Sequence, residues 1–244
     1  MPNIYLSPST QEFNPYIIGG NEEYYMNLLA DEMEPWLRSS GITWTRNSPQ
    51  DTARDAIQES NQGNYDLHLA LHSNASPEGK EGQNQGGEIY YDPRSSRGRR
   101  AAQIIAGNLR NIYPGTVRTL PTESLGEVND TRAPAVLVEL AYHDNPQDAR
   151  WITENLPAIA ENLVLSLTQY FGIPLVPPQP ERPGRVQVRQ GGVNLRIRPS
   201  TAAPVLTVMP NGAPVTILGQ WQNWLVVEYR GQVGYAAAPY IRSL

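Results

Sequence analysis

The hydrophobic and polar positions of residues 1–172 predict strands and helices that alternate along the chain. Short apolar runs of strand length are separated by longer segments with helical periodicity. The predicted strands cover residues 3–7, 42–46, 65–73, 87–92 and 134–142, and the predicted helices cover 21–41, 51–62, 95–113 and 148–172. Pro157 lies inside the last helix and predicts a kink or break there. Such alternation is typical of an α/β domain with three layers and a mostly parallel sheet.

After residue 185 the pattern changes to short β segments without helices. Turns rich in Gly, Pro and Asn separate these segments, and about 60 residues of this kind predict a small β-barrel. The stretch GIPLVPPQPERPGR, residues 172–185, contains five prolines and predicts an extended, semi-rigid spacer. The predicted organisation is a first domain over residues 1–172, a proline-rich linker over 173–184 and a second domain over 185–244.

Composition narrows the classes of protein that fit this pattern. The 244 residues are 39% hydrophobic and 18% charged, as in ordinary globular proteins. The lack of cysteine excludes disulfides, thiol catalysis and cysteine-ligated metals. No apolar run is long enough to predict a membrane span. The first ten residues, MPNIYLSPST, lack the basic and apolar regions of a secretory signal.

The net charge of −5 is unevenly distributed. Residues 185–244 carry six arginines against Glu228 alone, so this region has a charge of +5 and the rest of the chain −10. A basic second domain on an acidic body favours an anionic partner for that domain. A chance surface composition is the alternative.

The predicted strand over residues 65–73 ends on an imidazole. His68, Ala70 and His72 share one face of this strand, and about 13 Å separates the two histidines along it. They therefore cannot easily bind one metal ion, and His68 is expected to be a core histidine with a hydrogen-bond partner. His72 lies at the carboxyl end of the strand, where α/β sheets gather ligands, and is the better site candidate.

A second apolar strand, PAVLVELAYHDN, contains a carboxylate. Glu139 follows three apolar residues, and a buried glutamate is costly unless it is paired or functional. His143 comes four residues later, in the loop after the strand. From these residues alone, Glu139 is either a functional group or the partner of an arginine.

Three segments, YDLHLALHSNA, GEIYY and TRAPAVLVELAYHDNPQDA, carry a specific resemblance. In order and spacing they resemble zinc-dependent N-acetylmuramoyl-L-alanine amidases of the Amidase_3 type, and the likeness extends over residues 3–171. The resemblance implies a three-layer amidase domain. It also implies a peptidoglycan hydrolase that uses a zinc-activated water to cleave the amide between N-acetylmuramic acid and L-alanine. His72 would then be a zinc ligand and Glu139 the catalytic glutamate.

The second zinc ligand of that family is a glutamate that opens the first helix, where this sequence offers Glu22 and Glu23. Glu22 precedes Met26 by four residues, on the apolar face of the predicted helix, and Glu23 is turned about 100° away. Glu22 is therefore the predicted ligand. Glu23 is expected to be an N-terminal carboxylate that the helix dipole favours.

The family's first ligand, a histidine in a DPGHGG-like loop, has no counterpart here. The chain reads PSTQEF, and Thr10 falls where the histidine should be. A catalytic zinc site uses about three protein ligands and an open position. His143 is the remaining imidazole and the predicted third ligand. Ligation by a residue of the 8–20 loop, a two-ligand site and the absence of a metal stay open.

The last 60 residues resemble bacterial SH3 domains in the segments VNLRIRPST, WLVV and GQVGY. Such domains bind peptidoglycan, and the basic surface favours anionic wall polymers as well. The sequence as a whole thus predicts an autolysin or endolysin that acts outside the cell or in the cell wall. The protein would arrive there by export or by phage-type release. Its predicted partner is peptidoglycan, not nucleic acid. The alternative is a non-catalytic wall-binding protein on a degenerate amidase fold.

Overall fold

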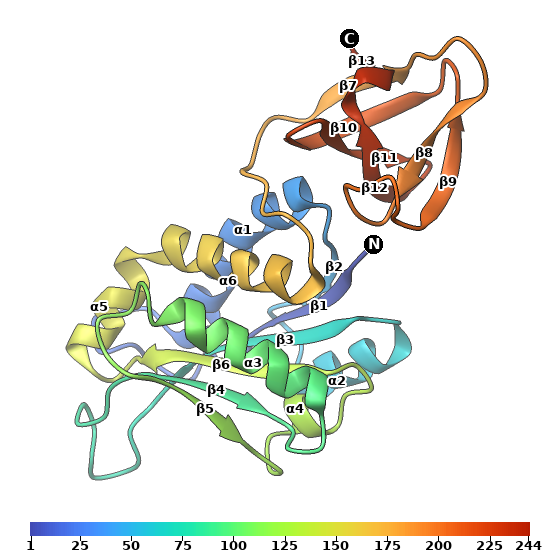
Figure 1. Ribbon diagram of the computed structural model, residues 1–244. Helices are drawn as coiled ribbons and strands as arrows, with labels where there is room; N and C mark the ends of the chain where they lie inside the picture. Colours follow the sequence, from blue (N-terminus) through green and yellow to red (C-terminus); the bar gives the residue numbers. More distant parts are fainter. The chain divides into compact units, whose positions relative to one another are not determined.

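The computed structural model describes residues 1–244, which form two compact units (Figure 1). One unit comprises residues 3–33 and 44–170, and the other comprises residues 1–2, 34–43 and 171–244. Helix α1 (Glu22–Ser40) begins in the first and ends in the second. The boundaries at residues 172 and 185 stay a prediction. None of the helices has both the length and the apolar character that crossing a membrane would need.

A six-stranded sheet in the order β2-β1-β3-β6-β4-β5 forms the centre of the first unit. β1, β3 and β6 are parallel neighbours, whereas β4 runs antiparallel to β6 and parallel to β5. The sheet is therefore mostly parallel, as predicted. Its strands are β1 (Asn3–Pro8), β2 (Thr43–Arg46), β3 (Leu67–Asn74), β4 (Gly87–Tyr91), β5 (Val117–Pro121) and β6 (Ala135–Tyr142).

The remaining helices are α2 (Ala53–Gln62), α3 (Ser96–Leu109), α4 (Gly126–Asn129), α5 (Pro146–Glu154) and α6 (Leu156–Phe171). The segment predicted as one helix over 148–172 is two, α5 and α6, with a break at Asn155. Pro157 lies in the first turn of α6, where its missing N–H breaks no helical hydrogen bond. β5 and α4 were not among the predicted elements.

The two faces of β3 differ in character. Leu67, Leu69 and Leu71 on one face are completely buried, which accounts for the apolar pattern of the strand. On the other face Ala70 packs against Val128 of α4 and Leu137 of β6. α4 therefore lies on the same face as His68 and His72, whereas α3 and α6 lie together over the sheet in Figure 1. This arrangement places a short helix directly beside the histidines.

The C-terminal part of the second unit is all β, as predicted. Seven antiparallel strands follow the order β13-β7-β10-β11-β12-β8-β9, and apolar side chains from most of them fill one core. The strands are β7 (Arg182–Val186), β8 (Gly192–Arg196), β9 (Val205–Pro210), β10 (Pro214–Trp221), β11 (Trp224–Tyr229), β12 (Gln232–Ala237) and β13 (Ile241–Ser243), with a 3₁₀ turn at Ala238–Tyr240.

The proline-rich segment of the second unit is anchored at one point. Val176 is completely buried, and its backbone N–H donates to Ser40 Oγ at 2.9 Å. Its carbonyl accepts from Ser39 Oγ at 2.5 Å. Residues 173–181 form no helix or strand, so these bonds hold the segment without regular structure.

Candidate functional site

The candidate site lies at the carboxyl ends of the parallel strands. His72 of β3 and Glu139 of β6 are paired in register, so they stand side by side on neighbouring strands. Glu22, the first residue of α1, reaches the same place and is only 1% exposed. Asn21 caps the helix through Oδ1, which accepts from the Tyr24 N–H at 2.8 Å. The structure thus brings together three residues that the sequence singled out, and it is Glu22, not Glu23, that is buried there.

His72 lies between two carboxylates. Its Nδ1 is 2.8 Å from Glu22 Oε1, and its Nε2 is 2.9 Å from Glu127 Oε2. A carboxylate only accepts, so both ring nitrogens act as donors and the ring carries a positive charge. Burial alone would lower the pKa of His72, but the hydrogen bonds to Glu127 and Glu22 outweigh it and raise that pKa well above its ordinary value. The ring is thereby fixed from both sides.

Glu22 is held by the loop that follows β1. Its Oε2 accepts from Asn14 Nδ2 at 2.7 Å, and its backbone N–H donates to the Asn14 carbonyl at 3.0 Å. Burial would raise the pKa of Glu22, but the hydrogen bonds and the charge of His72 bring it below the ordinary value. Gln11 of the same loop places Nε2 3.4 Å from His72 Nδ1. The loop that lacks the expected histidine therefore contacts both Glu22 and His72 through amides.

Glu139 differs from Glu22 and Glu127, whose oxygens are all hydrogen-bonded, in having a free oxygen. Its Oε2 is buried and has no hydrogen-bond partner. Burial raises the pKa of Glu139 to about 7, and the positive charge of His72 opposes this shift. No ion pair joins Glu139 to an arginine, so the structure does not support the alternative of a paired strand glutamate. A carboxyl group with a free oxygen and a pKa near neutrality is suited to accept and donate protons.

His143 is buried beside the site but bonded to a different partner. Its Nδ1 lies 2.9 Å from the Ser73 carbonyl and 3.0 Å from Ser73 Oγ, and its ring stacks on Tyr16 with centroids 5.2 Å apart. None of its hydrogen bonds reaches Glu22 or His72. A bond from Nδ1–H to the carbonyl leaves Nε2 as the nitrogen that could bind a metal. The third-ligand role of His143 stays a prediction.

Glu127 is the site residue that the sequence did not reveal. It lies on the four-residue helix α4 and is 6% exposed. Besides His72, it contacts His68 Nε2 at 3.4 Å and accepts from Ser7 Oγ at 2.5 Å. His68 is completely buried and also bonds Ser60 Oγ at 3.0 Å, as expected for a core histidine. The only sequence signal was a charged residue directly before the apolar Val128, which is buried in the structure.

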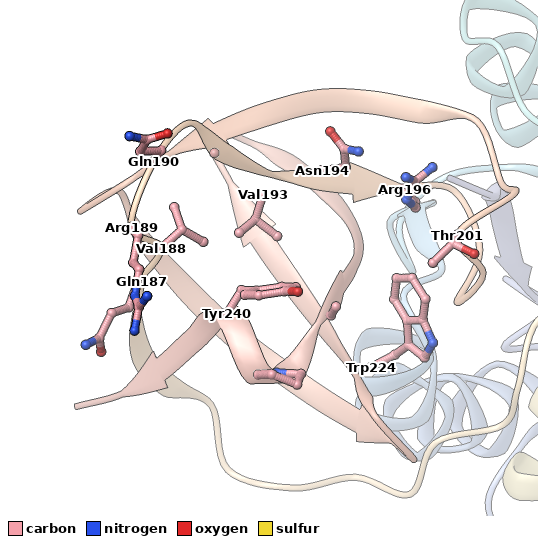
Figure 2. Close-up of a pocket in the computed structure, with 13 residues that line it drawn as sticks. Gln187, Val188, Arg189, Gln190, Val193, Asn194, Arg196, Thr201, Trp224 and Tyr240 are labelled. Carbon is pink, nitrogen blue, oxygen red and sulfur yellow. The ribbon is translucent and has the colours of Figure 1, made fainter.

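The second unit has a pocket of its own, with a volume of about 710 Å³ (Figure 2). Trp224 and Tyr240 provide aromatic surface, and Arg189 and Arg196 provide positive charge, with no acidic residue in the lining. Arg196 donates to the Ala203 carbonyl at 2.6 Å, which fixes its guanidinium, whereas Arg189 is exposed. The pocket therefore combines apolar surface with positive charge.

Residues 14–169, more than half of the chain, match the N-acetylmuramoyl-L-alanine amidase family Amidase_3. The chain belongs to this family. Residues 191–242 match the bacterial SH3 domain, so an Amidase_3 domain is followed by an SH3 domain, as predicted. Both matches fall on regions in which the sequence resemblance was found.

The probable cell wall amidase LytH of Staphylococcus saprophyticus is 25% identical to this chain over 152 residues, which are 62% of this chain and 50% of that protein. The chain spans about half the length of this relative.

Solved structures show the same fold. The N-acetylmuramoyl-L-alanine amidase AmiC2 of Nostoc punctiforme has a TM-score of 0.62 at 15% identity, with 70% of this chain and 97% of that chain covered. The catalytic domain of CwlV from Bacillus (Paenibacillus) polymyxa has a TM-score of 0.61 at 18% identity, with 70% and 99% covered. These likenesses confirm the predicted amidase fold.

Two side chains of this Amidase_3 domain have atoms of the kind that bind zinc. Glu22 Oε1 and His72 Nδ1 are an oxygen and a nitrogen of the kind that zinc binds, and they lie 2.8 Å apart, so zinc would replace the proton that Nδ1 donates to Glu22. No group of three His, Asp or Glu side chains in the structure could hold a metal ion. The residues therefore fit two zinc ligands, and the third position is not assembled from these side chains.

Proposed function

We propose that the protein hydrolyses the amide between N-acetylmuramic acid and L-alanine in peptidoglycan, with zinc held by Glu22 and His72. Membership of the Amidase_3 family supports the substrate class. The single observation that carries the mechanism is the free oxygen of Glu139, buried beside the Glu22–His72 pair. When bound, zinc would polarise the scissile carbonyl and make a water molecule more acidic.

In this proposal Glu139 moves the protons. Its unpartnered Oε2 is available to take a proton from water and later to deliver it to the leaving amine of L-alanine. Burial raises the pKa of Glu139, which makes its carboxylate a stronger proton acceptor. Asn14 and Glu127 hold Glu22 and His72 in place.

The proposed reaction can be tested by following new L-alanine amino termini. Purified peptidoglycan incubated with the protein and zinc should release them, and a chelator should stop the release. Restoring zinc should restore it. If the zinc-supplied protein releases no amino termini, although it still binds walls, the non-catalytic alternative would replace this proposal.

The SH3 domain is proposed to hold the protein on the wall through its pocket. The pocket offers aromatic and cationic side chains without a carboxylate, which suits an anionic wall component. Peptidoglycan peptides and anionic wall polymers both have this character. Exposed charges at a binding surface act mainly through electrostatic attraction, so binding should weaken as salt concentration rises.

Arg189→Glu should weaken this wall binding without affecting hydrolysis of soluble muropeptides. Arg189 is exposed, so the change reverses a charge in the pocket without disturbing the core. The measurement is sedimentation of the full-length protein with purified walls at several salt concentrations. Arg198→Glu is the matched control, since Arg198 is exposed in the same domain but does not line the pocket. Equal loss in both variants would indicate general charge attraction rather than a pocket.

A further inference from the structure

The His72 ring has a second carboxylate partner that lies on the side away from Glu22. Glu127 Oε2 is 2.9 Å from His72 Nε2, whereas Glu22 Oε1 is 2.8 Å from Nδ1. An imidazole that binds a metal through one nitrogen carries its proton on the other. A carboxylate that accepts a hydrogen bond from this N–H decides which nitrogen remains for the metal and fixes the plane of the ring.

We propose that Glu127 is a positioning residue that commits His72 Nδ1 to the metal by accepting the hydrogen bond from Nε2–H. This inference rests on the proposed function, because it requires His72 to be a zinc ligand. Glu127 touches neither the scissile bond nor the metal in this proposal. It acts through His72 alone.

Glu127 is itself held in a fixed position. Its Oε1 accepts from Ser7 Oγ at 2.5 Å and lies 3.4 Å from His68 Nε2. These three side chains and that of His72 are less than 10% exposed, so no solvent competes for their hydrogen bonds. The other oxygen, Oε2, is thereby left for His72. Glu127 thus forms a buried polar connection from His68 to His72.

The anchoring of α4 supports the same role. Val128, the residue after Glu127, packs against Ala70 and Leu137, which belong to the strands that carry His72 and Glu139. The packing of Val128 therefore fixes the backbone of Glu127 against the sheet, two residues from His72 on one strand and two residues from Glu139 on the other. A short helix has little stability by itself, so this packing is what sets the position of the carboxylate.

Two substitutions of different severity test the proposal. Glu127→Leu removes the acceptor, and Glu127→Gln keeps an acceptor oxygen without the charge. We expect the dissociation constant for zinc, measured by chelator competition, to rise about 10–100-fold in Glu127→Leu, and by less in Glu127→Gln. Glu59→Gln is the matched control, because Glu59 is a glutamate that bonds Tyr5 OH at 2.7 Å and makes no contact with His72.

A spectroscopic signal separates positioning from a purely structural role. In the zinc-loaded protein labelled with ¹⁵N-histidine, the Nε2 proton of His72 should resonate far downfield, as expected for a bond to a carboxylate. It should move upfield in Glu127→Gln and remain unchanged in Glu59→Gln. The chain has three histidines, so assignment by single substitution is practical.

The results that would contradict the positioning role differ from those that would contradict the proposed function. If His72→Ala abolishes zinc binding while Glu127→Gln changes neither the proton resonance nor the zinc affinity, the positioning role is wrong and the proposed function stands. If His72→Ala leaves zinc binding intact, both fail. Should Glu127→Leu not fold, the comparison of Glu127→Gln with Glu59→Gln decides the matter alone.

Discussion

Glu139→Gln should reduce the rate of amide hydrolysis by a factor on the order of 10²–10⁴, the usual contribution of general acid–base catalysis. The substitution preserves the shape of the side chain and removes its ability to take up a proton. Glu139 is not a proposed zinc ligand, so zinc content and wall binding should persist. The measurement is the release of L-alanine amino termini from purified peptidoglycan by the wild type and the variant. Undiminished release by the variant would remove Glu139 from the mechanism.

Glu139→Gln should also change the thermal stability of the protein in a predictable way. This change serves as a control for the activity measurement. Burial raises the pKa of Glu139 from an ordinary 4.5 to about 7, so the folded zinc-free protein favours the protonated form. Ionisation therefore costs the folded state stability as pH rises from about 4.5 through about 7. Glutamine avoids this cost. Zinc-free Glu139→Gln should melt at a higher temperature than the wild type at pH 8, and the difference should shrink towards pH 4.

His72→Ala should abolish zinc binding and, with it, hydrolysis. The loss of affinity should exceed the roughly 10–100-fold effect that is typical of an outer-shell partner, because a ligand atom is removed. The variant also leaves the Glu22 and Glu127 carboxylates buried without the positive charge between them, so it should be destabilised by about 3–5 kcal/mol. Zinc content is measured by elemental analysis after reconstitution, with circular dichroism as the check on folding.

His143→Ala is the comparison variant for this experiment. His143 is buried like His72, but its hydrogen bonds go to Ser73, so its removal leaves Glu22 and His72 bonded to each other. Weaker zinc binding in His143→Ala would support the predicted third ligand. Full zinc occupancy in that variant would leave the third position to the 8–20 loop or to solvent. His72→Gln, which keeps a polar side chain, covers the case in which His72→Ala does not fold.

Local sequence patterns were sufficient for much of the fold. The alternation of apolar runs and helical periodicity predicted the strands that became β1, β3, β4 and β6, because buried strands must be apolar whatever they pair with. The change to short β segments after residue 185 predicted the second, all-β region for the same reason. Periodicity also distinguished Glu22 from Glu23, since the first turn of a helix fixes which side chain faces inward.

Residues 148–172 and the short elements β5 and α4 show which features local sequence patterns did not predict. Pro157 predicted a kink or break within residues 148–172, but the apolar periodicity gave no sign that it falls at Asn155, because both helices bury the same kind of face. β5 and α4 were missed for a different reason. Only Val117 of the five residues of β5 is buried, so this strand has no apolar pattern, and the four residues of α4 are too few to establish a helical period. The pairing of β5 with β4 exists only in the folded sheet.

By itself, the sequence determined that His72 and Glu139 end or interrupt apolar strands, because a charged side chain in such a run is costly and therefore conspicuous. Only the tertiary structure decided what surrounds them. Register placed Glu139 beside His72, and α4 brought Glu127 to His72 from 55 positions away in the chain. His143 is likewise hydrogen-bonded to Ser73, which lies 70 positions away in the chain. Such contacts depend on how strands pair and helices pack, and no short segment of sequence carries that information.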